Sequence, residues 1–475
     1  MRGRVVAAVL VPSVLLVGVG SYAFADARDL VPGIITSSPL PSPQPPLITA
    51  SPLTVASPSP GPVDGLSSSA PVPSPDAVAA LAAELRADKR TGTSTNVYVA
   101  DYTTGEVLAS LDGEDPQVPA STTKLLTAVA ALEALGPAFT FDTTVVRSGS
   151  ALTLVAGGDL MLASGHGHGG SVYDAEGEVE ANGWAGIADL GDQIEAAVPV
   201  GAVSIAVDTS DFPGPSYPAA WPSYPLTMGY AGRVEGIAIN IGKKDGVPAS
   251  EYGARDKEPA LRALKLLAAD LNSRGYSVTV DGQGTAASGS EEVARVHSAP
   301  LSAVVTELLR YSDNTVAEQT ARVLALQAGL AATPANAAAE TKKVLAGMGV
   351  SVEGLALYDG AGFSAKNQVA PLTLVGALVA SRATANTAGL LTYLPLGGLE
   401  GTVNARFAAT PSAGFLRAKT GSLTGVTALT GVVVTADGRQ LAFATLLDGM
   451  PYGQKKPMAA IDEFVNALAQ CGCAG

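Results

Sequence analysis

The spacing of hydrophobic and polar positions predicts a chain that mixes helices with antiparallel strands. Apolar residues recur every three or four positions where helices are expected, and they alternate with polar residues where strands are expected. One hairpin is predicted at residues 96–111 with a turn at Thr104-Gly105, and another within residues 415–449 with a turn at Asp437-Gly438. Helices are predicted over residues 75–90, 119–136, 258–276, 298–329 (two helices with a break at 312–314) and 455–470. An antiparallel sheet packed against helices, an α+β fold, follows from these elements.

Residues 139–257 differ in composition from the segments on either side. They are rich in Gly, short strand-like stretches and Pro-containing turns, which predicts a β-rich insert. The expected organisation is therefore a larger domain in two parts, 76–138 and 258–475, with the insert between them.

The N-terminal 75 residues do not show the pattern of a packed domain. Two arginines precede a charge-free apolar run from Val5 to Ala25 that ends in Ala-Phe-Ala, which predicts a secretory signal peptide over residues 1–25. The run is also long enough to cross a bilayer, so a retained membrane anchor is the alternative. Residues 26–75 are predicted to be a Pro/Ser-rich linker, because the stretch from 31 to 75 holds 13 of the 32 prolines. We expect the folded part to be secreted or to lie in the extracytoplasmic cell envelope.

Composition argues against several classes of function. The formal net charge of −14 provides no basic surface for nucleic acid. The two cysteines, Cys471 and Cys473, are too few for a four-ligand zinc site, so we expect no metal and no cofactor. There are three histidines and no G-x-S-x-G motif, so a Ser-His-Asp triad is not indicated. His166 and His168 are interpreted as part of an exposed Gly-rich loop, and His297 as a structural residue.

A serine activated by a lysine is the remaining candidate for chemistry. Ser121 and Lys124 form an S-x-x-K motif at the start of a predicted helix, where positions i and i+3 share a face. Lys124 can accept the Ser121 proton if burial or a nearby cation lowers its pKa. The free N–H groups at the helix start add positive potential around the serine oxygen.

Two further motifs follow in a fixed order. Ser312-Asp313-Asn314 interrupts two predicted helices, and Lys419-Thr420-Gly421 lies on a predicted strand. Each short match alone is common, since Ser94-Thr95-Asn96 also fits S-x-N. The ordered set S-x-x-K, S-D-N and K-T-G is the signature of penicillin-binding proteins and class A β-lactamases.

With these motifs the chain resembles the low-molecular-mass class C penicillin-binding proteins, the D-alanyl-D-alanine carboxypeptidase/endopeptidase family of the DacB type. Further similar stretches are LTLVAGGDLML (152–162), LYDGAGFS (357–364), LPLGGLEGTVNARF (394–407) and residues 418–449. Departures from the family pattern at Leu160, Ala361 and Phe363 concern substrate contacts rather than the catalytic set. The resemblance implies the penicillin-binding/β-lactamase-like serine transpeptidase fold, with the β-rich domain inserted between S-x-x-K and S-D-N.

The resemblance also implies catalytic roles. Ser121 would attack the carbonyl between two terminal D-Ala residues of a peptidoglycan stem peptide and form an acyl-enzyme, with Lys124 as general base. Ser312 would relay a proton toward the leaving amine, and Asn314 would hold the peptide amide of the acyl part. Lys419 would supply positive charge beside Ser312 and so help to keep Lys124 neutral.

A substrate-binding set is implied in the same way. Thr420 would bind the terminal carboxylate of the substrate, and the backbone N–H groups of Ser121 and Ser422 would form the oxyanion hole. Asp313 and Gly421 complete the expected set. β-Lactams, which mimic the D-Ala-D-Ala amide, would acylate Ser121.

Alternative functions remain open at this point. A β-lactamase is disfavoured because Lys124 and Ser312 lie 188 positions apart, much farther than in class A enzymes. The Leu-Asn pair of the class A deacylating E-x-x-L-N element is found only at 271–272, before S-D-N, with Ala268 in place of Glu. A non-catalytic cell-wall sensor on the same scaffold is disfavoured by the intact motifs. An esterase or amidase acting on another D-amino-acid substrate, and the balance of carboxypeptidase and endopeptidase activity, are not decided by the sequence.

Overall fold

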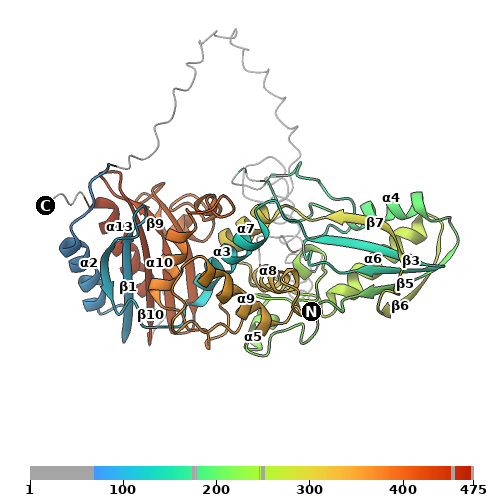
Figure 1. Ribbon diagram of the computed structural model, residues 1–475, viewed down its shortest axis with the longest axis horizontal. Coiled ribbons are helices and arrows are strands. Elements are labelled where there is room, and N and C mark those ends of the chain that lie inside the picture. Colours follow the sequence, from blue (N-terminus) through green and yellow to red (C-terminus); the bar gives the residue numbers. More distant parts are fainter. Residues whose placement is uncertain are drawn as a thin grey trace, which may run out of the picture. The chain divides into compact units, whose positions relative to one another are not determined.

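The computed structural model describes residues 69–173, 177, 179–244, 247, 252–450 and 455–471. The predicted signal peptide and residues 26–68 of the predicted linker lie outside these ranges. The described residues form two five-stranded sheets with helices packed on them (Figure 1). No described helix combines the length and the apolar character that crossing a membrane requires.

The first sheet has the strand order β2-β1-β10-β9-β8, and all neighbouring strands are antiparallel. Its strands are β1 (Ser94–Asp101), β2 (Val107–Leu111), β8 (Leu416–Leu423), β9 (Val426–Val434) and β10 (Gln440–Asp448). Both predicted hairpins are present, with Gly105 and Gly438 at positive φ in the turns. Both faces of the sheet are buried: in β1, Val97 belongs to one hydrophobic core and Tyr98 to the other.

Helices cover each face of this sheet (Figure 1). Helices α2 (Pro75–Ala87) and α13 (Lys455–Gln470) pack on one face, where Val78, Phe464 and Phe443 share a core. On the other face lie α3 (Thr123–Leu135) and α10 (Pro371–Ala380). Helix α3 is central, because it also packs against α7 (Leu301–Arg310), α8 (Asn314–Gln327) and α9 (Pro334–Gly347). Every residue from Thr123 to Leu132 is consequently buried.

The second sheet has the order β6-β5-β4-β3-β7. Its strands are β3 (Asp142–Ser148), β4 (Ala151–Val155), β5 (Ala202–Asp208), β6 (Ser277–Gln283) and β7 (Glu291–His297). The β4–β5 and β5–β6 pairs are parallel, and α4 (Ile187–Ala197) and α6 (Pro259–Ser273) pack against the sheet. Parallel neighbours need crossover connections, and these two helices supply them.

This sheet corrects the predicted insert in two respects. The insert is a mixed α/β domain rather than a purely β-rich one, because α4 and α6 belong to it. It also extends to about residue 297, beyond the expected boundary at 257, because β6 and β7 pair with the same sheet. The antiparallel sheet with helices, interrupted by an insertion between S-x-x-K and S-D-N, confirms the predicted fold class.

Shorter elements connect these parts. They are η1 (Ala120–Thr122), α5 (Tyr224–Met228), η2 (Asn240–Gly242), α11 (Leu390–Tyr393), η3 (Gly401–Val403) and α12 (Asn404–Phe407). Of these, η1, α5, η3 and α12 each contribute a residue to the cleft described next.

Candidate active site

Ser121 is the middle residue of the short helix η1, which leads directly into α3. Ala120, which precedes it, has a φ of +48°, a left-handed conformation that costs a non-glycine residue about 1 kcal/mol or more. The neighbouring loop fits around this bend only with glycine, since a Cβ on Gly362 would lie 1.9 Å from the carbonyl oxygen of Ala120. The surrounding packing therefore holds a strained backbone at the point where Ser121 lines a cleft.

Lys124 lies one turn along and is completely buried. Its Nζ is 2.9 Å from Ser121 Oγ, 2.6 Å from Asn314 Oδ1 and 2.7 Å from the carbonyl oxygen of Ala361. The amide and carbonyl oxygens only accept hydrogen bonds, so they take two hydrogens of the amine. A neutral amine has two hydrogens and one lone pair. The geometry thus leaves the lone pair for the Ser121 hydroxyl, as a general base requires.

Burial lowers the pKa of Lys124 to about 7, because the charged form is desolvated. The carboxylates of Asp359 and Asp313 act in the opposite direction and keep the pKa from falling further. A substantial share of Lys124 is therefore neutral at physiological pH.

This shift predicts the pH dependence of Ser121 acylation. The base must be neutral, so acylation slows as pH falls through the pKa of Lys124 and levels off above it. We expect a midpoint near pH 7 and a rate at pH 5 about 100-fold below the plateau. The measurement is the second-order rate constant of labelling by a fluorescent penicillin between pH 5 and 9. A rate still rising steeply above pH 9 would indicate an unperturbed lysine.

Ser312 and Lys419 form a second serine–lysine pair. Ser312 has a φ of +61° at the break between α7 and α8, and Lys419 Nζ lies 2.9 Å from its Oγ. Lys419 is fully buried and also donates to the carbonyl oxygen of Thr420 at 2.9 Å. The pKa of Lys419 lies well below its usual value, first because of burial and then because Lys124 opposes a second positive charge.

The role of Lys419 as a source of positive charge beside Ser312, which helps to keep Lys124 neutral, stays a prediction. Burial is the main cause of the low pKa of Lys124. The 2.9 Å contact between Lys419 Nζ and Ser312 Oγ also allows a proton to pass between these two groups.

Asn314 and Asp313 open helix α8. The Asn314 side chain accepts from Lys124 and donates through Nδ2 to the carbonyl oxygen of Tyr230 at 2.9 Å. Asp313 points elsewhere: its Oδ1 accepts from the backbone N–H groups of Thr315 and Val316, which is an N-cap. Its Oδ2 lies 3.4 Å from buried Arg255. We therefore correct the expectation that Asp313 binds substrate, because its carboxylate is committed to capping the helix and pairing with Arg255.

A buried turn at residues 359–364 was not assigned a role from the sequence, although it belongs to one of the similar stretches. The Asp359 carboxylate accepts from the backbone N–H groups of residues 361–364, at 2.5 to 3.0 Å, and from Asn367 Nδ2 at 3.1 Å. These bonds fix the carbonyl oxygen of Ala361, which receives a hydrogen bond from Lys124. The contribution comes from the backbone of residue 361, so the residue type alone could not indicate it.

The cleft beside these groups has a volume of about 580 Å³. The described residues that line it are Ser121, Tyr224, Tyr230, Tyr252, Ser312, Asn314, Phe363, Thr402, Arg406, Thr420, Ser422, Leu423 and Met458. Four are aromatic, and their rings meet edge to face or tilted, as in Tyr230–Tyr252 at 4.8 Å between centroids. Hydroxyl-bearing residues and Arg406 supply the polar part of the lining. The aromatic residues, Thr402 and Arg406 were not predicted from the sequence.

The K-T-G strand forms a polar wall of the cleft. Thr420 and Ser422 line it, and Thr420 Oγ1 donates to Thr402 Oγ1 at 3.0 Å. Gly421 does not face the cleft as a binding group. A Cβ there would lie 2.7 Å from the carbonyl oxygen of Pro119, so glycine allows β8 to approach the segment that carries Ser121. Gly421 therefore allows the K-T-G strand to lie close to the segment that carries the S-x-x-K motif.

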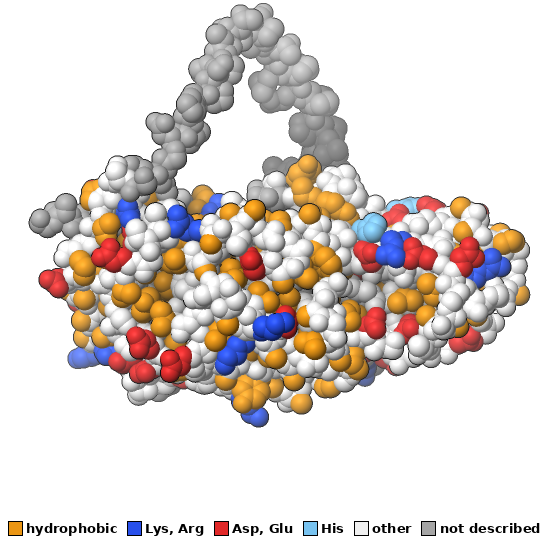
Figure 2. All heavy atoms as spheres, viewed as in Figure 1, with side chains coloured by type: hydrophobic (Ala, Val, Ile, Leu, Met, Phe, Trp, Pro, Cys, Tyr) orange, Lys and Arg blue, Asp and Glu red, His pale blue; other side chains and the backbone are white. Residues whose placement is uncertain are grey.

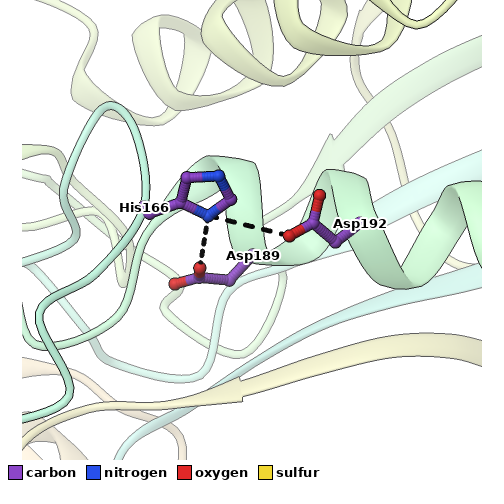
Figure 3. Close-up of side chains that lie close together, drawn as sticks. All are labelled: His166, Asp189 and Asp192. Carbon is purple, nitrogen blue, oxygen red and sulfur yellow. Dashed lines mark hydrogen bonds and ion pairs between the residues drawn. The ribbon is translucent and has the colours of Figure 1, made fainter.

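The histidines lie apart from the described cleft lining. His166 Nδ1 is 2.8 Å from Asp189 Oδ1 and 3.7 Å from Asp192 Oδ2 (Figure 3). Asp189 also accepts from the backbone N–H of Gly186 at the start of α4, and Asp192 pairs with Arg274 at 2.7 Å. The three side chains are thus engaged as ion pairs and a helix cap. Figure 2 shows histidine, acidic and basic side chains mixed on this part of the surface.

A serine that follows a strained residue at a helix start, a buried lysine with a lowered pKa and a second serine–lysine pair define a serine acyl-transfer enzyme on an α+β fold. Comparison with known proteins supports this assignment to a class of enzyme. A model of the D-Ala-D-Ala carboxypeptidase 3 (S13) family matches residues 77–251 and 244–471. Carboxypeptidase DacB of Mycolicibacterium smegmatis is 32% identical over 481 residues, covering 99% of this chain and 96% of that protein.

Solved structures show the same fold. The crystal structure of penicillin binding protein 4 (dacB) from Haemophilus influenzae has a TM-score of 0.68 and 20% identity, covering 83% of this chain and 99% of that one. A structure of that protein complexed with a β-lactam has a TM-score of 0.60 and 19% identity, covering 82% and 99%. The chain belongs to the D-Ala-D-Ala carboxypeptidase 3 (S13) family of serine peptidases, as the motifs predicted.

Proposed function

We propose that this protein removes the terminal D-Ala from peptidoglycan stem peptides through an acyl-enzyme on Ser121, and that it cuts D-Ala cross-links by the same chemistry. The observation that carries the proposal is the Lys124 amine. Two of its hydrogens are taken by Asn314 and Ala361, so its lone pair faces Ser121. We also propose that it acts outside the cytoplasm, in keeping with the apolar run at residues 5–25.

Acylation follows from this arrangement. Lys124 Nζ takes the proton of the Ser121 hydroxyl while Oγ forms a bond to the carbonyl carbon of the penultimate D-Ala. The backbone N–H groups of Ser121 and Ser422 stabilise the oxyanion. The C–N bond then breaks, and the leaving amine receives, through the Ser312 hydroxyl, the proton that Lys124 took from Ser121, so that Lys124 is neutral again. Lys419 Nζ lies 2.9 Å from Ser312 Oγ and holds that hydroxyl in place during the transfer.

Deacylation reverses the order with water as the nucleophile. Water loses a proton to Lys124 and forms a bond to the acyl carbon. The ester bond to Ser121 then breaks, and the serine oxygen regains a proton. A β-lactam enters by the same first step, because the opened ring remains attached to Ser121 as an ester. The β-lactam complex of a structurally similar protein supports this expectation.

The cleft suggests how the substrate lies. The hydroxyl-bearing wall with Thr420 and Ser422 suits the C-terminal residue with its carboxylate. The aromatic residues Tyr224, Tyr230 and Tyr252 suit the peptide on the acyl side, because aromatic rings pack well against methylene groups. Asn314 lies between Lys124 and the Tyr230 backbone, where it can hold the amide of the acyl part.

The test is incubation of the purified protein with a stem pentapeptide, a cross-linked muropeptide dimer and penicillin. We expect release of D-Ala from the pentapeptide, resolution of the dimer and a slowly released penicilloyl adduct. Ser121→Ala should abolish all three, whereas Ser110→Ala on β2 should not. Rapid penicillin turnover would favour a β-lactamase. Penicillin labelling without any hydrolysis of the peptides would favour a sensor.

A further inference from the structure

The start of helix α8 is bonded to the inserted domain. Asn314 Nδ2 donates to the carbonyl oxygen of Tyr230 at 2.9 Å, and the guanidinium of Arg255 lies 3.4 Å from Asp313 Oδ2. Both partners belong to the insert and lie 84 and 58 positions earlier in the chain. Two residues of the S-D-N motif thus take partners from another domain.

The Asn314 side chain contacts two groups of opposite kind. Its Oδ1 accepts from Lys124 Nζ at 2.6 Å, whereas the Tyr230 carbonyl oxygen can only accept and so requires the Nδ2 side of the amide. If the amide were turned over, its Oδ1 would face another acceptor at Tyr230, and an Nδ2 hydrogen would compete with Ser121 for the Lys124 lone pair. The Tyr230 carbonyl therefore selects the orientation that leaves the lone pair to Ser121.

Arg255 holds the segment that carries the Tyr230 carbonyl. Its side chain is 1% exposed and donates to the carbonyl oxygens of Gly229 at 3.2 Å and Ile241 at 2.7 Å. Gly229 has a φ of +77°, and a Cβ there would lie 2.1 Å from the carbonyl oxygen of Gly253. Only glycine lets the segment pack this closely against the residues just before Arg255.

A second contact fixes the same segment directly to α8. The N–H of Gly232 donates to Thr315 Oγ1 at 2.9 Å, and Thr315 is 1% exposed. The backbone is therefore fixed on both sides of the Tyr230 carbonyl, by Arg255 before it and by Thr315 after it. The two anchors differ in kind, because one is a charged guanidinium and the other a neutral hydroxyl. Substitutions at the two positions therefore test the arrangement independently.

We propose that Arg255 and Thr315 are positioning residues for acylation. They hold the Tyr230 carbonyl where it orients the Asn314 amide. The inference rests on the proposed function and concerns its first chemical step. It assigns part of the catalytic arrangement to the insert, which contributes no residue to the three motifs. A substitution at either anchor should slow acylation of Ser121, although neither anchor is among the described residues that line the cleft.

The experiment is a double-mutant cycle on the rate constant for labelling of Ser121 by fluorescent penicillin. Arg255→Met is expected to lower this rate constant about 30-fold and Thr315→Val about 5-fold. In an Asn314→Ala background both losses should shrink to less than about 2-fold, because the group that the anchors orient is already absent. Thr315→Ser keeps the hydroxyl and should label at the wild-type rate.

Arg274→Met is the matched control. Arg274 belongs to the same domain, where it pairs with Asp192 and Asp270 at 2.7 Å each and so joins α4 to α6. Its loss should lower Tm but change the labelling rate by less than about 2-fold. This control separates destabilisation of the insert from a change at Asn314.

Two results would overturn the positioning role. One is labelling of Thr315→Val at the wild-type rate, which decides the question even if Arg255→Met fails to fold. The other is a loss of the same size with and without the Asn314→Ala substitution, since a merely structural effect would be independent of that side chain. A cycle that shows the expected coupling, in a protein that releases no D-Ala, would overturn the proposed function alone.

Discussion

Replacement of Lys124 by Met is expected to slow acylation of Ser121 by at least about 1,000-fold. Met has nearly the same length but no lone pair suited to accept the serine proton, and general-base catalysis contributes about 100- to 10,000-fold. The variant should still fold, because Met suits a fully buried position at the core of α3. The measurement is the rate of labelling by fluorescent penicillin, with thermal unfolding measured on the same sample.

The matched control is Lys366→Met. Lys366 is exposed on the loop that follows residues 359–364, and its ammonium lies 5.9 Å from the Tyr358 ring centroid. Its loss removes one positive charge near the site without removing a contact to Ser121. We expect labelling within 2-fold of the wild type. If Lys124→Met retained labelling within 10-fold of the wild type, another group would have to act as the base.

Replacement of Asp359 by Ala is expected to lower both stability and activity. The change leaves four backbone N–H groups and the Asn367 amide without their acceptor, all in a buried turn. Each buried unsatisfied donor costs about 1–3 kcal/mol, and partial relaxation still leaves an expected loss of about 4 kcal/mol or more. This corresponds to a fall in Tm on the order of 10 °C. Differential scanning calorimetry checks the value.

The same substitution should slow acylation about 100-fold at a temperature where the variant is folded. The turn would no longer fix the Ala361 carbonyl oxygen, so the Lys124 amine would lose one of its two acceptors. Asp437→Ala, in the exposed β9–β10 turn, is the control and should change Tm by less than about 2 °C. An Asp359→Ala protein that melted with the wild type and was labelled at the wild-type rate would contradict this account of the turn.

The sequence predicted the parts of the site that are contiguous in the chain. The S-x-x-K motif could be interpreted from the sequence because a helix places Ser121 and Lys124 on one face, a relation that follows from their spacing alone. Ser312 and Lys419 could be placed beside them only through the family signature, since local patterns give no distance across the chain. The structure brings them into a hydrogen-bonded group because α3 packs against α8 and β8 packs against η1.

The other features of the site, and the boundary of the insert, depend on tertiary contacts, which short sequence patterns do not reveal. The Asp359 carboxylate contacts backbone groups, and the contact of Thr402 with Thr420 joins residues 18 positions apart. Asp313 was misassigned because a residue within a catalytic motif can serve the helix cap instead. The insert boundary was placed too early because α6 resembles a helix of the main domain in composition. Only the pairing of β6 and β7 with β3 to β5 shows that this segment belongs to the second sheet.

Localisation of the covalent adduct tests the central claim most directly. Wild-type protein is incubated with penicillin, digested and analysed by mass spectrometry, in parallel with Lys124→Met. We predict one penicilloyl group per chain on Ser121 in the wild type, and none in the variant over the same time. An adduct on another residue, or D-Ala release by a protein that forms no adduct at Ser121, would contradict the account.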